Sequence, residues 1–213
     1  MEVQNHGLLF ENEVIKALTG LSKVEYQRLL PGSYTTSMDI TKGYHSENDY
    51  SVKVTGNNGV GCGDILRFFK HCRDGEFTMV VGRWKQTGPS RKVYYEIYEF
   101  YLKPENHSVL FAELEEKPLA EFVDYVKSIP YGKEAQLANR KLWKSKRNDL
   151  YETYGKGLVS IDAKIDSKTQ RRVQCSVKIP DMISAGIQYK KYTLSFKGIN
   201  LPYEQKSSPR SFS

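Results

Sequence analysis

The sequence lacks the features that mark several large protein classes. Its three cysteines, Cys62, Cys72 and Cys175, form no CxxC pair, which argues against a disulfide framework or a structural zinc site. Its four histidines form no HExxH pair. No apolar run approaches the length of a membrane span, and no charged-then-apolar leader opens the chain, so we expect a cytoplasmic protein.

The glycine-rich segment Gly56–Gly63 also lacks a nucleotide-binding signature. It does not end in Gly-Lys-Ser/Thr, and no GxGxxG motif opens a βαβ unit in this chain. We therefore exclude a phosphate-binding loop for a nucleotide and predict a flexible loop with a closely approachable backbone. Asn57 and Asn58 in this loop can pair with adenine edges or contact a phosphate, although Asn also simply favours turns.

Size and charge narrow the remaining classes. A chain of 213 residues with 39% hydrophobic residues can bury one good core but is short for two typical domains. We predict one domain over residues 1–203 and a flexible tail over 204–213. The net charge of +7 favours an anionic partner, of which nucleic acid is the commonest. The 15 tyrosines either stack on bases or fill a β-rich core.

The most informative stretch runs from Met38 to Asp64. We interpret its first part as two short strands joined by a polar connection over Gly43–Asn48. Because side chains alternate along a strand, one face of the second strand carries Asp49, Ser51, Lys53 and Thr55, and the other carries Tyr50, Val52 and Val54. If the two strands pair, Asp39 of the first strand approaches Ser51 and Lys53 of the second.

This grouping of a carboxylate and an ammonium group has a chemical use. A carboxylate at a strand end can hold Mg²⁺ together with a backbone carbonyl, water and a substrate phosphate. An ammonium group on the neighbouring strand can orient or deprotonate the attacking water and stabilise negative charge on the phosphate. An ordinary surface ion pair between Asp39 and Lys53 is the alternative.

Asp39 and Ser51-Val52-Lys53 resemble the core motif of the PD-(D/E)XK nucleases, in which a carboxylate precedes a strand carrying acid-x-Lys. The stretch looks most like the small type II restriction endonucleases that cut four-base sites, the MspI group, in which the second acid is often relaxed to Asn or Gln. The order of the later elements is also similar, including Leu150–Gly155 followed by a basic hairpin. The chain departs from the family pattern by having Met38 before Asp39, where the family has Pro, and the uncharged Ser51 as the second motif residue.

The resemblance implies Mg²⁺-dependent, sequence-specific hydrolysis of double-stranded DNA, with a cognate methyltransferase in the same restriction-modification system. It implies that Asp39 and the carbonyl of Val52 bind the metal, that Lys53 positions or activates water, and that Ser51 hydrogen-bonds water or phosphate. Related nucleases carry a Glu on the first helix that points at the metal, so Glu11 is the candidate for the missing acid, with Glu13 as the alternative. A two-fold dimer cuts a palindrome most simply, and one subunit acting twice is the other arrangement.

Periodicity predicts the other elements. Helices are predicted over Gly7–Gly20, Asp64–Cys72, Pro118–Ser128 and Lys133–Tyr154, and strands over Phe77–Trp84, Lys92–Leu102, Leu158–Ala163, Arg171–Ile179 and Gln188–Lys197. The pattern over Val24–Leu30 does not distinguish a strand from a helix. These elements predict an α/β fold with a central mixed sheet flanked by helices, and the resemblance implies the restriction-endonuclease version of it.

Two basic elements are candidates for contact with DNA. The long helix carries a cationic cluster that could follow a phosphate backbone, including Arg140 and Lys144. The second strand of the hairpin carries residues suited to the major groove, namely Arg171, Arg172, Gln174 and Lys178. A solvated helix surface and a solvent-facing strand are the alternatives for these two elements.

Two other functions remain open from the sequence. One is a PD-(D/E)XK nuclease of repair or recombination that reads DNA structure rather than sequence. The other is a basic nucleic-acid-binding protein without catalysis, in which Asp39 and Lys53 form only an ion pair.

Overall fold

The computed structural model describes residues 2–30, 38–88, 91–166 and 170–206. The chain divides into two compact units. Unit 1 comprises Met1–Val60, Glu76–Leu102 and Ile187–Ser213, and unit 2 comprises Gly61–Gly75 and Lys103–Gly186.

Unit 1 is built on a mixed sheet, as the sequence predicts. Its strands are β1 (Tyr50–Thr55), β3 (Phe77–Gly88), β4 (Arg91–Leu102), β7 (Tyr189–Tyr192) and β10 (Tyr203–Lys206). The strand order is β1-β3-β4-β10, with β7 also pairing with β4. β1 runs parallel to β3, whereas the other pairs are antiparallel. β1 therefore ends the sheet, and among the described residues its outer edge carries only the bridge between Ile40 and Tyr50.

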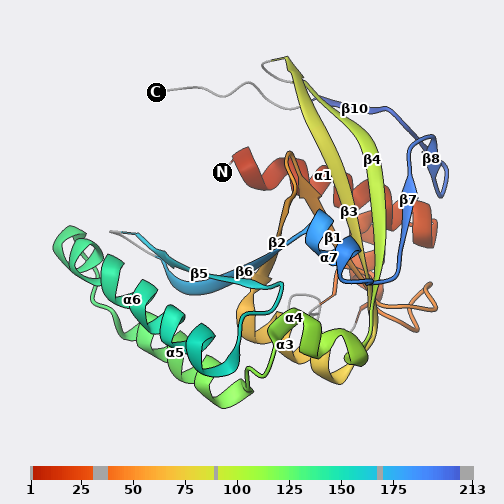
Figure 1. Cartoon of the computed structure of the whole chain (residues 1–213). Coiled ribbons are helices and arrows are strands. Elements are labelled where there is room, and N and C mark those ends of the chain that lie inside the picture. The colour runs from red at the N-terminus through yellow and green to blue at the C-terminus, as the bar shows by residue number, and fades with distance from the viewer. Residues whose placement is uncertain (1, 31–37, 89–90, 167–169, 207–213) are drawn as a thin grey trace. The chain divides into compact units, whose positions relative to one another are not determined.

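Helix α1 (Glu2–Thr19) covers one face of this sheet, and α2 (Lys23–Leu29) follows it (Figure 1). Phe10 and Val14 of α1 are fully buried against Val52, Val80 and Ile97 of three neighbouring strands. The two-residue strands β8 (Ser195–Phe196) and β9 (Ile199–Asn200) form a small hairpin in the same unit. The apolar side of β1 thus faces α1, which places the first helix next to the candidate site.

Unit 2 combines a three-stranded sheet with helices. The sheet has the order β2-β6-β5, formed by β2 (Gly59–Asp64), β6 (Arg171–Lys178) and β5 (Ser160–Ile165). The helical elements are α3 (Ile65–Asp74), the 3₁₀ turn η1 (Pro104–Asn106), α4 (His107–Phe111), α5 (Glu116–Ser128), α6 (Lys133–Tyr154) and α7 (Ile179–Ser184). Helices α5 and α6 lie along one side of β5 and β6 (Figure 1).

Several sequence predictions need correction. The predicted loop Gly56–Gly63 is a short turn followed by strand β2, because these glycines find a pairing partner in β6, more than 100 residues away. The predicted tail from 204 onward begins as strand β10, which pairs with β4, while residues 207–213 lie outside the described residues. The predicted first strand of the core stretch is reduced to one bridge, Ile40 with Tyr50. In the part of the chain that the structure describes, no helix is long and apolar enough to cross a membrane.

The seating of α1 on the sheet generates a testable prediction. Phe10 stacks on Tyr94 with 4.6 Å between ring centroids, and a Cβ added at Gly82 would lie 2.5 Å from the Phe10 ring. We expect Gly82→Ala to lower the free energy of unfolding by about 1–3 kcal/mol, because the helix must shift. Gly88→Ala on the same strand is the control, since its Cβ would meet only an ordinary contact at 3.8 Å. Equal urea midpoints for the two variants would contradict this packing.

Candidate active site

The candidate site is built on the outer edge of β1. The backbone of Tyr50 bonds Ile40 on this edge, with Tyr50 N donating to Ile40 O at 2.8 Å and Ile40 N donating to Tyr50 O at 3.1 Å. Because alternate residues of a strand present their polar groups to the same edge, the N–H and C=O of Val52 also point away from β3. Asp39 directly precedes Ile40, and its Oδ2 accepts the Val52 N–H at 2.6 Å. The predicted approach of Asp39 to this strand is confirmed.

Lys53 completes this edge. Its Nζ donates to the Val52 carbonyl at 3.1 Å and lies 3.4 Å from Asp39 Oδ2. Both side chains are about one quarter exposed, with 24% for Lys53 and 28% for Asp39. Ser51 is half-buried and lies two residues before Lys53, on the same face of β1. The ammonium group is therefore partly accessible to solvent, and it donates to the carbonyl of the same residue whose N–H Asp39 accepts.

Glu11 of α1 responds to the charges of this site. Burial raises the pKa of Glu11, and the charge of Asp39 adds to the rise, whereas Lys23 and Lys53 oppose it. Glu11 is therefore close enough to Asp39 and Lys53 for their charges to act on it. Burial raises the pKa of Tyr203 of β10, and the charge of Glu13, the alternative acid, adds to that rise.

Sequence reasoning missed one charged residue of the site. Lys23 Nζ lies 2.7 Å from Glu11 Oε1, and the two side chains are only 19% and 17% exposed. The sequence does carry a signal for the helix that begins at Lys23, because Ser22-Lys23-Val24-Glu25 has the spacing of a capping box. The pairing of Lys23 with Glu11 depends on how this helix packs against α1.

The oxygen atoms of the site suit Mg²⁺ in kind. The candidate ligands are two carboxylates, Asp39 and Glu11, and the Val52 carbonyl, and Mg²⁺ prefers such hard oxygen donors. Among the described residues, Asp39 Oδ1 takes part in no hydrogen bond, so one carboxylate oxygen remains for a metal. Within the same residues, no group of three or more His, Cys, Asp or Glu side chains is arranged to hold a metal ion.

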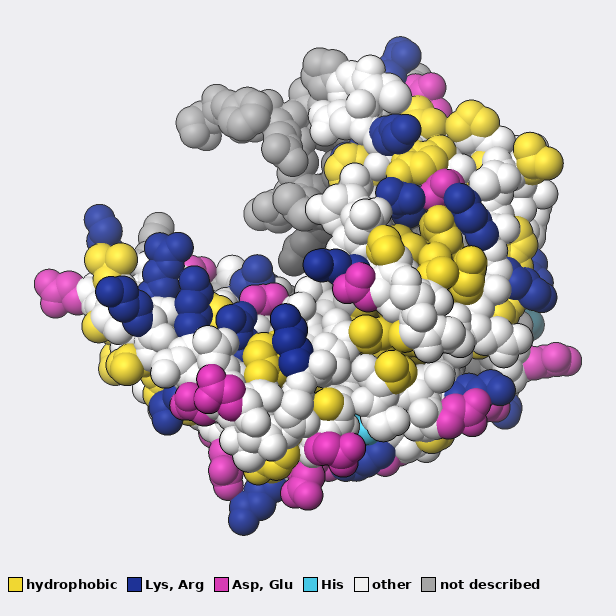
Figure 2. Space-filling view, in the orientation of Figure 1, with side chains coloured by type: hydrophobic (Ala, Val, Ile, Leu, Met, Phe, Trp, Pro, Cys, Tyr) yellow, Lys and Arg dark blue, Asp and Glu magenta, His cyan; other side chains and the backbone are white. Residues whose placement is uncertain are grey.

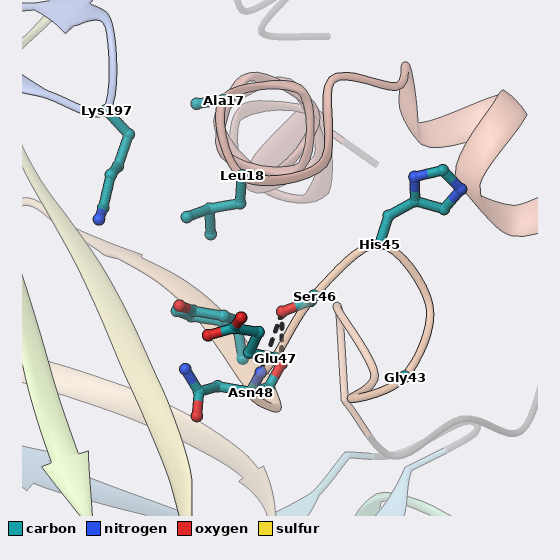
Figure 3. A pocket seen from close by; sticks show the side chains of 9 residues that line it. Ala17, Leu18, Gly43, His45, Ser46, Glu47, Asn48 and Lys197 are labelled. Carbon is teal, nitrogen blue, oxygen red and sulfur yellow. Dashed lines mark hydrogen bonds between the residues drawn. The ribbon is translucent and has the colours of Figure 1, made fainter.

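The candidate site lies along the outer edge of strand β1. A separate hollow of about 540 Å³ lies in unit 1, between α1 and the segment that precedes β1 (Figure 3). Leu18 and Lys197 point toward it from one side, and Glu47 and Asn48 border it on the other. None of the predicted catalytic residues lines this hollow.

The two asparagines after β1 have local partners. Asn57 Oδ1 accepts hydrogen bonds from Gly59 N at 2.7 Å and from Thr55 Oγ1 at 3.2 Å, which closes the turn between β1 and β2. Asn58 is exposed, and its Oδ1 accepts from Arg83 Nη2 at 3.2 Å. Turn formation therefore accounts for Asn57, whereas Asn58 presents its amide at the surface beside an Arg.

The predicted basic surface of α6 is present. Arg140 and Lys144 are exposed, together with Lys141 and Lys146. Figure 2 shows Lys and Arg side chains gathered over this helix. Arg147 differs, because it is half-buried, donates to Ile161 O at 3.3 Å and lies 3.7 Å from Asp162.

The hairpin of β5 and β6 separates its candidates into two groups. Arg172 and Lys178 are exposed and Gln174 is half-buried, and all three alternate with the buried Val173, Cys175 and Val177. Arg171 falls on the buried face, which does not favour the predicted contact with DNA. Its guanidinium donates to four carbonyls of its own unit, those of Ile129, Pro130, Asp166 and Gln170. The guanidinium N–H groups that could donate to the edge of a base therefore already donate to these carbonyls.

No family model, curated protein or solved structure matches this chain.

The assignment of Arg171 predicts a stability effect. Arg171→Met would leave four backbone carbonyls without their donor, so we expect the free energy of unfolding to fall by about 2–4 kcal/mol. The neighbouring Arg172→Met removes the same charge from an exposed position and should change it by less than about 0.5 kcal/mol. Urea titration of both variants makes the comparison. A stable Arg171→Met protein with weakened DNA binding would restore the role that the sequence suggested.

Proposed function

We propose that this chain is a Mg²⁺-dependent DNA endonuclease of the type II restriction class, with a restriction-endonuclease-like arrangement of unit 1. The observation that carries the proposal is the meeting of Asp39 and Lys53 at the backbone of Val52, where Asp39 accepts the N–H and Lys53 donates to the carbonyl. The charges of both side chains also act on the pKa of Glu11. An ordinary surface ion pair needs only two side chains. Here a strand-edge carbonyl accompanies the pair, and the pKa of a second acid responds to both charges. Phosphodiester hydrolysis uses groups of these kinds.

Each residue has a role in this proposal. Asp39, Glu11 and the Val52 carbonyl would hold Mg²⁺, which when bound supplies a Lewis acid for the phosphate and an acidified water. Lys53 orients the attacking water and stabilises the negative charge that develops on the phosphate. Ser51 hydrogen-bonds the water or a phosphate oxygen. Asp39 Oδ1, which takes part in no hydrogen bond within the described segments, and the neutral Ser51 favour one metal ion over two.

The basic surfaces supply the binding partner in the proposal. Exposed Arg140 and Lys144 on α6 can neutralise phosphates, and Arg172, Gln174 and Lys178 on β6 offer donors for phosphates or base edges. Asn58, on the turn after the strand that carries Lys53, is a further contact to DNA. A two-fold dimer remains the simplest way to cut both strands of a palindrome.

Digestion of a long, fully sequenced, unmethylated DNA with Mg²⁺ tests the proposal. Discrete bands on a gel are expected, and sequencing of their ends gives the site and the stagger. A smear would instead indicate a nuclease that reads DNA structure or none. Intact DNA with several metals, combined with a gel shift, would indicate a binding protein without catalysis and would overturn the proposal.

The role of Lys53 predicts the effect of its removal. Lys53→Ala should retain the fold and lower the rate of cleavage by about 10²–10⁴-fold, the usual contribution of a positioned acid or base. Lys42→Ala is the matched control, because it removes one exposed lysine from the same unit and should cut at the wild-type rate. Single-turnover cleavage of a duplex that contains the mapped site gives both rates. Wild-type cutting by a folded Lys53→Ala protein would eliminate this role.

A further inference from the structure

Lys23 forms an ion pair with Glu11, the carboxylate that would bind the metal. Its Nζ lies 2.7 Å from Glu11 Oε1, and less than one fifth of either side chain is exposed. A partly buried ion pair of this kind is held more firmly than a surface pair, since water screens it less. Glu11 therefore has a resident cation, which binds one of the oxygens needed for a metal.

The backbone of Lys23 is fixed at this position by the junction of α1 and α2. Lys23 N donates to Asn12 Oδ1 at 2.9 Å, and Asn12 is the residue after Glu11 on α1. Ser22 and Glu25 close a capping box, in which Glu25 N donates to Ser22 Oγ at 3.3 Å and Ser22 N donates to Glu25 Oε2 at 2.8 Å. Only the flexible four-carbon stem of Lys23 is thus free to move its ammonium group away from Glu11.

We propose, on the basis of the nuclease function above, that Lys23 is an internal competitor of the metal ion for Glu11. Without metal, Lys23 neutralises Glu11 while Lys53 neutralises Asp39, so two acids are balanced by two lysines. A divalent cation at Glu11 would repel the like-charged ammonium group of Lys23 and would compete with it for Glu11 Oε1. The Lys23 side chain would then turn to solvent. Lys23 thereby weakens metal binding and keeps the site charge-balanced between turnovers.

Calorimetric titration of the full chain with Mg²⁺, and separately with Ca²⁺, in the absence of DNA tests this role. Lys23→Met keeps the length of the stem and removes the charge, so we expect the dissociation constant to fall about tenfold. Lys42→Met removes an exposed lysine of the same unit and should leave the constant within about twofold. Lys23→Gln repeats the test with a polar side chain if the Met variant does not fold.

A double-mutant cycle with Glu11→Gln identifies the carboxylate over which the two cations compete. In the Glu11→Gln protein the competition is gone, so Lys23→Met should improve Mg²⁺ binding by less than about threefold. A full tenfold gain in that background would mean that Lys23 acts by general charge, and would overturn the competition at Glu11. Weaker binding by Lys23→Met would also overturn it, because Lys23 would then hold Glu11 in position for the metal.

Asp39→Asn separates this inference from the proposed function. If Asp39→Asn abolishes Mg²⁺ binding and Lys23→Met matches the wild type, the metal site stands and only the competition fails. If Asp39→Asn and Glu11→Gln both bind Mg²⁺ as the wild type does, the proposed metal site is wrong, and the role of Lys23 falls with it.

Discussion

The candidate site depends on the hydrogen bond from Val52 N–H to Asp39 Oδ2. β1 uses one edge to pair with β3, so the polar groups on its other edge must find other partners. The backbone of Ile40 hydrogen-bonds the backbone of Tyr50. Asp39 Oδ2 accepts the N–H of Val52 at 2.6 Å, and Lys53 Nζ donates to the Val52 carbonyl. The same short stretch of backbone thus fixes both charged side chains. A strand in this place would otherwise be an exposed edge open to another chain.

Charge balance explains why a site with two acids can form without a metal. Burial penalises the charged form of Glu11, and the nearby Asp39 adds to that penalty. An unpaired, partly buried carboxylate costs more than most single interactions can return, so each acid needs a cation close by. Lys53 and Lys23 supply them from β1 and α2. The two lysines therefore balance the charge of the two acids.

Local signals predicted much of the fold, and distant contacts account for what was missed. Helix α6 has the predicted bounds, Lys133–Tyr154, and Asp64 caps α3 as its position suggested, with its Oδ1 accepting from Arg67 N. The approach of Asp39 to the Lys53 strand was predictable from alternation and a short connection. Strand β2 was not, since its glycines have low strand propensity and are held by β6 from far along the chain. The Glu11–Lys23 pair likewise depends on how two helices pack.

Arg171 and Arg172 show how the pattern of a strand can outweigh the type of a residue. Both are cationic, and residue type alone made both candidates for DNA contact. Side chains two apart share a face, so Arg171 belongs with Val173, Cys175 and Val177, and Arg172 with Gln174 and Ser176. The structure follows this rule, with Arg171 8% exposed and bonded to four carbonyls, and Arg172 exposed. An arginine in step with an apolar face is therefore better interpreted as a donor to buried carbonyls, even within a strand that carries binding residues on its other face.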